Sequence, residues 1–480
     1  MTAAAAPMMT LGQAAAWLPG GLPVGDLGTA VTRVHSDTRS LQPGDLFVAL
    51  EGDRYDANQF LAQAKTSGAA AALCHKGADL AGAGLPGIEV ADSKSALGTL
   101  GTAWRSRFTL PLIAVTGSNG KTTVTQMLAA ILRAWKPSAT LATQGNLNND
   151  IGVPLTLLRL RAEHQVAVVE LGMNHPGEIA ALASMAQPTV VLVNNAQREH
   201  LEFMATVDAV AHENGAAISH LPPDGVAVFP HGDPFTGVWR RLAGERAQWT
   251  FGIAATDQAA AVKPADVLCA APRWFDGAWH LRVEAPDGPF DVVVHAAGRH
   301  NVQNALAAIT CALVVGVPQI AITRGLAEFE PVQGRSRIIP LLIGDRHITL
   351  VDDSYNANPD SVLAALDLLA SLPAPRLMVL GDMGEVGDQG ALFHRQAGEY
   401  AQALGIENLF TLGELCASTS NAHPHTRHFA DMPGLIGAVL GALDQSYSVL
   451  VKGSRFMQME RVVQAVTACA QKAQKEVHAL

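Results

Sequence analysis

A glycine-rich loop between a predicted strand and a predicted helix constrains this chain more than any other feature. Residues 112–115 form a continuous apolar run, residues 116–123 read Thr-Gly-Ser-Asn-Gly-Lys-Thr-Thr, and residues 124–134 have a helical pattern. Glycines allow the backbone to wrap around a phosphate, and the N–H groups at the start of a helix point towards it. The sequence therefore predicts a strand, a phosphate-binding loop and a helix in that order.

The side chains of this loop indicate nucleotide chemistry. Lys121 supplies a positive charge for the β- and γ-phosphates, and Thr122 supplies a hydroxyl for Mg²⁺. Val115 stands where the usual Walker sequence has its first glycine, so the loop is a shortened G-x-x-G-K-T variant. The alternative is a simple glycine turn, which the strand–loop–helix context disfavours. The predicted nucleotide-binding residues of the loop are Gly117, Ser118, Asn119, Gly120, Lys121, Thr122 and Thr123.

Further apolar runs predict parallel sheets. Runs at 166–169, 190–193, 348–351, 377–380 and 449–451 each end in polar residues and alternate with helical stretches. Continuous apolar strands belong to sheets that are covered on both faces, and such sheets bind ligands beyond the carboxyl ends of their strands. We therefore expect an α/β protein with its chemistry at those ends.

Breaks in the pattern divide the chain. The first 92 residues are rich in turns, and a second break lies at Glu330-Pro331. A length of 480 residues, at about 150 residues per domain, agrees with three domains. We predict domains at 1–92, 93–330 and 331–480.

Composition excludes several classes of protein. A net charge of −10 argues against a nucleic-acid binder. No apolar run of about 18 residues occurs, so no membrane span is expected, and the first residues lack the pattern of a secretion signal. The five scattered cysteines contain no C-x-x-C pair. These features favour a cytoplasmic protein that binds neither nucleic acid nor membrane.

Several side chains are candidate ligands for a cation. Glu170 ends one apolar run and His200 follows another. Mg²⁺ prefers oxygen ligands, so His200 is the weaker candidate on chemistry alone, and Glu170 could equally cap a helix or form a salt bridge. Asp382, Glu385 and Asp388 lie in a glycine-rich run that is either a cation site or a turn with solvated carboxylates.

Several segments, in order, resemble the ATP-dependent Mur ligases. Residues 36–39, 43–50 and 52–56 are similar to the UDP-sugar-binding domain of that family. Residues 143–154 resemble a run typical of the member that adds D-alanyl-D-alanine to UDP-N-acetylmuramoyl-tripeptide. The later segments with a counterpart in the family are 298–301, 334–335, 352–359 and 452–455. The resemblance covers essentially the whole chain.

The resemblance implies a role for each domain. The first would be an α/β domain that holds the UDP sugar, the second a parallel-sheet P-loop ATPase, and the third a Rossmann-like domain that binds the dipeptide. The implied UDP-sugar-binding residues are Ser36, Asp37, Thr38, Arg39, Asp53, Asn58, Asn146, Asn148 and Asn149. The residues implied to bind ATP besides the loop are Asn301, Arg335, Asp353 and Asn356. The implied metal ligands are Thr122, Glu170 and His200, and the implied catalytic residues are Lys121, Arg335 and His200.

The resemblance also implies a reaction. The terminal carboxylate of the UDP-muramoyl-tripeptide attacks the γ-phosphate of ATP, with Mg²⁺ bound, and the amine of D-alanyl-D-alanine then attacks the acyl phosphate. Closure of the last domain would bring Arg335, Asp353 and Asn356 onto the nucleotide, and the enzyme is expected to be a monomer. The alternatives are a phosphotransferase or plain NTPase, a nucleotide-sugar binder without turnover, and a sister ligase with another amino donor.

Three features distinguish this chain within the family. It lacks the Asp-Asn-Pro-Arg motif of the ligase that adds the third residue, which favours the D-alanyl-D-alanine enzyme. Asn58 stands where a histidine is common. Asn214 stands where the family usually has a lysine that is carbamoylated near a second magnesium. Asparagine cannot be carbamoylated, and the hypothesis is that its amide, Glu213 or water replaces that group.

Overall fold

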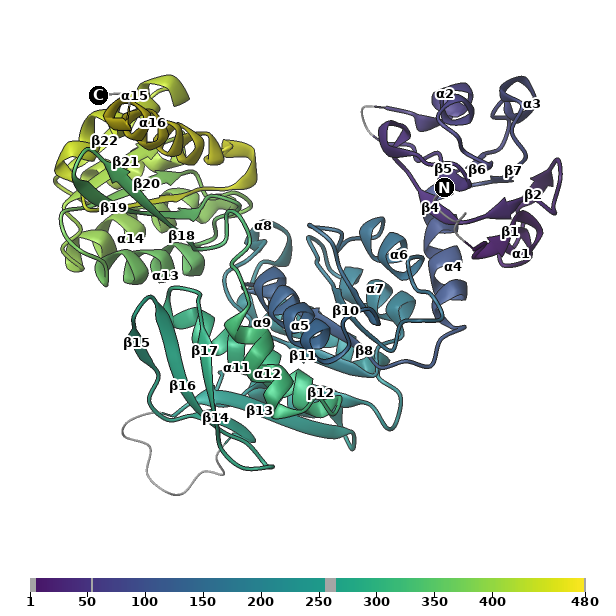
Figure 1. Ribbon diagram of the computed structural model, residues 1–480, viewed down its shortest axis with the longest axis horizontal. Coiled ribbons are helices and arrows are strands. Elements are labelled where there is room, and N and C mark those ends of the chain that lie inside the picture. Colours follow the sequence, from purple (N-terminus) through teal and green to yellow (C-terminus); the bar gives the residue numbers. More distant parts are fainter. Residues whose placement is uncertain (1–5, 53–54, 255–264, 479–480) are drawn as a thin grey trace.

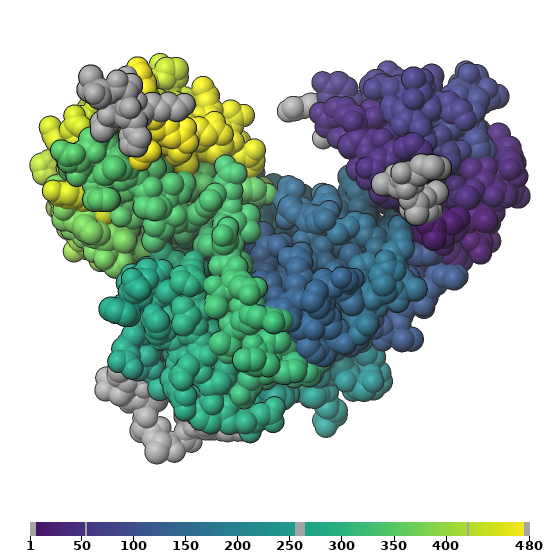
Figure 2. Space-filling view, viewed as in Figure 1, coloured from purple at the N-terminus to yellow at the C-terminus, as the bar shows by residue number. Residues whose placement is uncertain are grey.

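The computed structural model describes residues 6–52, 55–254 and 265–478. It contains three large sheets, one after another along the chain, each flanked by helices (Figure 1). The N-terminal domain and the C-terminal domain both sit on the central domain, and Figure 2 shows an open notch between them. The central domain is therefore the common base on which the other two are placed.

The N-terminal domain is built on a five-stranded sheet of order β2-β7-β6-β5-β4, with only β2 antiparallel. Successive side chains of a strand point to opposite faces, so Leu46 and Val48 pack towards the central domain while Phe47 packs into a smaller outer core. Its strands are β1 (Met9–Thr10), β2 (Leu22–Val24), β3 (Ala30–Val31), β4 (Arg33–His35), β5 (Asp45–Val48), β6 (Ala71–His75) and β7 (Gly87–Val90). Its helices are α1 (Leu11–Ala16), α2 (Leu61–Thr66) and α3 (Leu80–Ala83).

The central sheet has ten strands, and seven of them are parallel in the order β9-β10-β8-β11-β12-β13-β14. Strands β15, β16 and β17 extend it with antiparallel pairs, so the sheet is mixed and not purely parallel as expected. The expectation rested on continuous apolar runs, whereas β16 alternates buried and exposed residues because one face is solvated. The strands are β8 (Leu112–Thr116), β9 (Thr140–Ala142), β10 (Val166–Glu170), β11 (Val190–Val193), β12 (Val226–Pro230), β13 (Ala247–Ile253), β14 (Val267–Cys269), β15 (Arg273–Phe275), β16 (Ala278–Glu284) and β17 (Phe290–Val294).

Helices cover both faces of the parallel part of this sheet. Leu112 and Ala114 of β8 pack with one group of helices, and Ile113 and Val115 pack with the other. The first group includes α4 (Ser93–Arg105), α6 (Gly152–Leu157), α7 (Glu178–Ala186), α9 (Val207–Gly215) and α10 (Thr236–Ala243). The second group is α5 (Lys121–Trp135), α11 (Arg299–Val314) and α12 (Gln319–Ala327). The short helix α8 (Leu201–Met204) follows β11.

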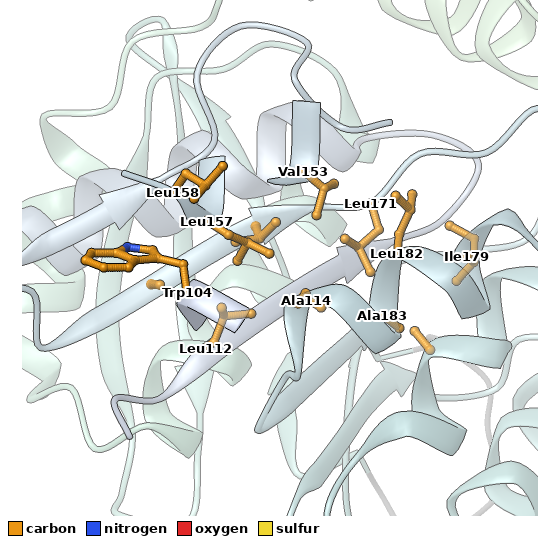
Figure 3. Packing of buried hydrophobic residues seen from close by; sticks show 14 of the residues in the cluster. Trp104, Leu112, Ala114, Val153, Leu157, Leu158, Leu171, Ile179, Leu182 and Ala183 are labelled. Atoms are coloured by element: carbon orange, nitrogen blue, oxygen red, sulfur yellow. The ribbon is translucent and has the colours of Figure 1, made fainter. Parts of the chain in front are cut away.

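Trp104 of α4 joins the central domain to the N-terminal domain, where the centre of the Trp17 ring lies 6.2 Å from the centre of its own ring. The Trp104 ring is 5% exposed and lies beside Leu157 and Leu158 (Figure 3), and its Nε1 donates a hydrogen bond to the Leu160 carbonyl at 3.0 Å. We expect Trp104→Ala to lower the free energy of unfolding by about 3–5 kcal/mol, because it leaves a cavity in a shared core. Urea denaturation followed by circular dichroism measures this. Phe275→Ala, at a side chain that is 70% exposed, is the control, and equal losses in the two variants would refute the packing role.

The C-terminal domain is Rossmann-like. Its six-stranded sheet has the order β18-β19-β23-β20-β21-β22, and only β18 is antiparallel. Asn358 caps the first helix with Pro359 at its first position. The strands are β18 (Arg337–Ile343), β19 (Arg346–Asp353), β20 (Arg376–Gly381), β21 (Asn408–Leu412), β22 (Thr426–Phe429) and β23 (Ser448–Lys452). Helices α13 (Pro359–Ala370) and α14 (Gly390–Ala403) cover one face, and α15 (Met432–Ala442) and α16 (Glu460–His478) cover the other.

Each predicted domain boundary falls within a segment that connects two of the large sheets. The first large sheet ends at Val90, and the second extends from Leu112 to Val294. The third begins at Arg337. We therefore propose domain limits near residues 92 and 330. Among the helices that the structure describes, none has both the length and the apolar composition needed to cross a lipid bilayer.

Candidate active site

A cavity of about 1240 Å³ lies between the central and C-terminal domains. It opens at the carboxyl ends of β8, β10 and β11, where ligands of parallel sheets bind. The predicted site residues that line it are Ser118, Asn119, Gly120, Lys121, Thr122, Thr123, Asn146, Asn148, Asn149, Glu170, His200, Asn301, Arg335, Asp353 and Asn356. The structure thus brings together residues from two predicted domains.

The phosphate loop follows β8 directly, and α5 begins at Lys121. Gly117 and Gly120 have φ values of +131° and +83°, which side chains disfavour. A Cβ atom at Gly117 would also lie 3.0 Å from the Cβ of Asn194. Gly117 does not line the cavity, and its N–H donates to Asn214 Oδ1 at 2.9 Å. The backbone conformation of the loop and its close approach to Asn194 therefore require glycine at 117.

Asparagine side chains fix the loop from the neighbouring strand. Asn195 Oδ1 accepts a hydrogen bond from the Asn119 N–H at 2.9 Å, and Asn194 Nδ2 donates to the Asn119 carbonyl at 2.8 Å. Asn194 Nδ2 also donates to Asn304 Oδ1, and Asn304 Nδ2 donates to Asn301 Oδ1, both at 2.9 Å. The site prediction missed Asn194, Asn195 and Asn304, although the first two directly follow an apolar run.

Lys121 is held at the mouth of the loop by three oxygen atoms. Its ammonium donates to the carbonyls of Gly117 and Ser118 at 2.5 and 3.1 Å, and to Glu199 Oε1 at 3.0 Å. Glu199 is buried and lines the same cavity. Burial raises the pKa of Glu199, but the charges of Lys121 and His200 outweigh it and the pKa is lowered. The carboxylate therefore stays ionised beside the loop. Sequence reasoning missed Glu199, for which adjacency to His200 was the available signal.

Glu170 and Thr122, both predicted metal ligands, are hydrogen-bonded to each other. Thr122 Oγ1 donates to Glu170 Oε1 at 3.2 Å, and Asn148 Nδ2 donates to the same oxygen at 2.7 Å. Glu170 Oε2 is buried and has no hydrogen-bond partner among the residues that the structure describes. A buried carboxylate oxygen beside a hydroxyl is a donor set that suits a hard cation. These residues therefore fit Mg²⁺.

His200 adopts a left-handed conformation with φ 51° and lies between two carboxylates. Its Nε2 is 3.4 Å from Glu199 Oε1, and its Nδ1 contacts a carboxylate oxygen of Glu385 from the C-terminal domain. Burial lowers the pKa of His200, but the two carboxylates outweigh it and raise the pKa to about 9. Glu385 thus belongs to the interface between the two domains.

Asp382 has a structural role in the C-terminal domain. Its carboxylate accepts the N–H of Cys416 at 2.7 Å and that of Leu415 at 3.2 Å. Asp382, His394 and Cys416 place possible ligand atoms within 4.8 Å of one another. However, both ring nitrogens of His394 are already bonded to backbone groups, at Met383 N and Gly390 O. This cluster is therefore explained by internal hydrogen bonds.

The C-terminal domain reaches the phosphate loop directly. Arg335 Nη2 donates to Thr122 Oγ1 at 3.4 Å, and its guanidinium lies 4.1 Å from the centre of the Tyr355 ring. Asn358 Nδ2 donates to Asn119 Oδ1 at 2.9 Å. Asp353 and Asn356 line the cavity, but their side-chain oxygens already accept hydrogen bonds from nearby groups of the C-terminal domain. Arg335 is therefore the best placed of the three to reach a phosphate.

An ion pair fastens the two domains beside the cavity. Asp360 accepts hydrogen bonds from the N–H of Arg198 at 2.7 Å and from its Nη2 at 2.6 Å. We expect Asp360→Asn to weaken this contact by about 1.5–3 kcal/mol, because charge-assisted hydrogen bonds are lost. Small-angle scattering would then give a larger radius of gyration. Asp367→Asn on the same helix, where Asp367 accepts from Tyr400 within the C-terminal domain, is the control. Unchanged scattering by Asp360→Asn would contradict the fastening role.

The predicted UDP-sugar residues lie in two places. None of the described residues before Ser118 lines the cavity, so Ser36, Asp37, Thr38, Arg39 and Asn58 are outside it. Arg39 donates to Asp37 at 2.6 Å and lowers the pKa of Asp37 to about 2. Asn58 is buried, donates to Asp56 and accepts from the His75 N–H at 3.0 Å. Asp53 lies outside the described residues.

Asn214 and Glu213 both accept hydrogen bonds away from the cavity, and Asn214 Nδ2 is buried with no hydrogen-bond partner among the described residues. Asn214 Oδ1 accepts the Gly117 N–H, as described above. Glu213 accepts the N–H groups of Gly177 and Ile179 at 2.9 Å each, at the start of α7. Neither residue lines the cavity. The structure therefore does not favour Asn214 or Glu213 as the replacement for a lysine carbamate.

Three family descriptions match consecutive parts of the chain. The Mur ligase family catalytic domain matches residues 30–105, the Mur ligase middle domain matches 115–312, and the Mur ligase glutamate ligase domain matches 335–455. The chain belongs to the Mur ligase family. This confirms the ligase class and the three-domain α/β fold predicted from the sequence.

Individual relatives are similar over nearly the full length. The UDP-N-acetylmuramoyl-tripeptide--D-alanyl-D-alanine ligase of Escherichia coli K12 is 40% identical over 460 residues, which covers 95% of this chain and 98% of the relative. The protein of the same name from Haemophilus influenzae is 34% identical, over 92% of this chain and 94% of its own. A crystal structure of MurF from Acinetobacter baumannii has a TM-score of 0.85 and 34% identity, over 97% of this chain and 99% of its own.

Proposed function

We propose that this chain joins D-alanyl-D-alanine to UDP-N-acetylmuramoyl-tripeptide and converts ATP to ADP and phosphate. The similarity to relatives named for this reaction supports the choice of substrates. The observation that carries the proposal is one cavity that contains the phosphate loop, the carboxylate of Glu170 and Arg335 from another domain. A plain NTPase needs no third domain at its phosphates.

The first step forms an acyl phosphate. A carboxylate oxygen of the peptide bonds to the γ-phosphorus, and the bond from that phosphorus to ADP breaks. This transfer depends on in-line positioning and charge neutralisation. Lys121 and Arg335 supply positive charge from opposite domains, and charge held in place before the reaction stabilises the transition state. When ATP binds, the Lys121 ammonium exchanges one of its three hydrogen-bond acceptors for a phosphate oxygen.

Thr122 and Glu170 would hold Mg²⁺, and His200, a further predicted ligand, would have to lose the proton that Glu199 and Glu385 stabilise. The ion, when bound, neutralises charge on the phosphates. Asn148 orients the Glu170 carboxylate through its hydrogen bond to Oε1, and this leaves Oε2 for the ion. This assigns to Asn148 a part in the metal site besides the predicted substrate contact.

The second step forms the amide. The amine nitrogen of D-alanyl-D-alanine attacks the acyl carbon, the bond from that carbon to the phosphate oxygen breaks, and the amine loses a proton. Arg455 lines the cavity, pairs with Glu460 at 2.7 Å through Nη1, and is exposed enough to turn towards the dipeptide carboxylate. Lys452 is buried and donates to Asp353 at 2.6 Å, so it is better suited to hold the C-terminal wall in place. Docking of the two domains keeps water from the acyl phosphate.

The N-terminal domain would hold the UDP sugar, outside the cavity described above. The notch between the N-terminal and C-terminal domains in Figure 2 leads down to the central domain. A substrate that spans this distance would place its sugar nucleotide on one domain and its peptide carboxylate near the phosphate loop. A cytoplasmic location and a monomeric state stay predictions from the sequence.

The test is phosphate release from ATP and Mg²⁺ with UDP-N-acetylmuramoyl-tripeptide, with and without D-alanyl-D-alanine, together with mass spectrometry of the product. Release that needs both partners and a pentapeptide product is the expected result. Release without the dipeptide would favour an NTPase, and release with another amino acid would favour a sister ligase. Binding of the UDP sugar without turnover would refute the catalytic proposal.

A further inference from the structure

Two carboxylate oxygens in the cavity share an unusual environment. Oε2 of Glu170 and Oε2 of Glu199 are both buried, and neither has a hydrogen-bond partner within the described parts of the chain. Both residues line the same cavity and contact the phosphate loop, Glu170 through Thr122 and Glu199 through Lys121. A buried, ionised carboxylate oxygen that accepts no hydrogen bond from the protein is suited to a cation.

A counter-ion role towards Lys121 does not account for Glu199 fully. The ammonium contacts Oε1 at 3.0 Å, and His200 Nε2 is also nearest to Oε1 at 3.4 Å. Oε2 is left without a partner among the residues described. Glu199 therefore has one oxygen for the loop lysine and a second oxygen for another positive group.

The spacing of the ligands points to a second cation. The possible ligand atoms of Glu170, Glu199 and His200 do not all lie within 4.8 Å of one another. Glu199 and His200 are neighbours, whereas Glu170 pairs with Thr122. One ion on Thr122 and Glu170 and another on Glu199 fit these two separate sets of contacts.

We propose that Glu199 is a ligand for a second divalent cation at the phosphates, in addition to the ion at Glu170. The inference rests on the proposed use of ATP with Mg²⁺. It also accounts for the asparagine at 214, since the side-chain oxygens of Asn214 and Glu213 accept backbone N–H groups and neither residue lines the cavity, whereas Glu199 does. The second site of this chain then needs no carbamoylated lysine.

The test measures Mn²⁺ binding by electron paramagnetic resonance, with the full-length protein and a saturating non-hydrolysable ATP analogue. Glu199→Gln should weaken one class of bound Mn²⁺ by at least about 10-fold. Glu202→Gln is the matched control, because Glu202 lies three residues further on, is exposed and does not line the cavity. Wild-type Mn²⁺ binding by Glu199→Gln would overturn the proposal.

Two further measurements make the result decisive. Glu199→Asp keeps the charge but withdraws the carboxylate, so it should also weaken that class of Mn²⁺, and unchanged binding by this variant would overturn the proposal. Wild-type binding should be the same in buffer free of carbon dioxide, and weaker binding there would mean that a carbamate supplies the ligand. Because these titrations need no muramoyl peptide, absence of a pentapeptide product would refute the proposed function separately.

Discussion

Lys121→Ala should lower kcat/KM for ligation by about 10²–10³-fold or more. The variant removes a positive charge that is fixed at the phosphate loop before the reaction begins, and such preorganised charge is a large part of transition-state stabilisation. Lys121→Arg should restore little, because a planar guanidinium does not replace a compact ammonium between two loop carbonyls and Glu199. Steady-state kinetics of pentapeptide formation measure both effects.

The control for this prediction lies at the other end of the same helix. Lys136 follows the last residue of α5, and its ammonium contacts Gln165 and the Trp135 ring at the surface. Lys136→Ala should leave kcat/KM within about twofold of wild type, since it changes a solvated group far from the cavity. Comparable losses in Lys136→Ala and Lys121→Ala would show that the effect is one of helix stability.

Arg335→Ala should lower kcat by about 10²–10³-fold while the affinity for the UDP sugar stays unchanged. Arg335 comes from the C-terminal domain and reaches Thr122 at the phosphate loop, so its charge serves the transferring phosphoryl group. The nucleotide-sugar residues predicted in the N-terminal domain are outside the cavity that Arg335 lines. Kinetics together with calorimetric titration of the UDP sugar separate the two effects.

Arg335→Lys and Arg337→Ala sharpen this second prediction. Lysine keeps the charge but loses the planar group that stacks on Tyr355 at 4.1 Å, so it should recover only part of kcat. Arg337 is exposed and lies two residues further on, at the start of β18, so Arg337→Ala should behave as wild type. A normal kcat for Arg335→Ala would contradict a role in the reaction.

Some parts of the fold follow from local sequence. The apolar runs that end at Thr116, Glu170 and Asn194 become β8, β10 and β11, because strands buried on both faces leave a continuous apolar signal. The antiparallel strands β15, β16 and β17 could not be predicted in this way. They alternate or expose their side chains, as strands with one solvated face do.

The candidate site also contains residues that local sequence predicts and residues that it does not. The glycine positions, Lys121 and Thr122 follow from the loop, because the shape of a tight turn at a helix start depends on neighbouring residues. Glu170 followed from its place at the end of an apolar run. Glu199 was missed, since a carboxylate in a polar stretch has no local mark of burial until β11 and the loop are brought together.

The phosphate loop, the strands that carry it and the family of the chain could all be predicted from the sequence, because they depend on short-range geometry and ordered motifs. The contacts between side chains that are distant in sequence became visible only in the folded chain. Arg335 and Thr122 are 213 residues apart in sequence, and Lys121 and Glu199 are 78 apart. Their contacts arise from the docking of whole domains and from strand order in a parallel sheet, neither of which leaves a local pattern.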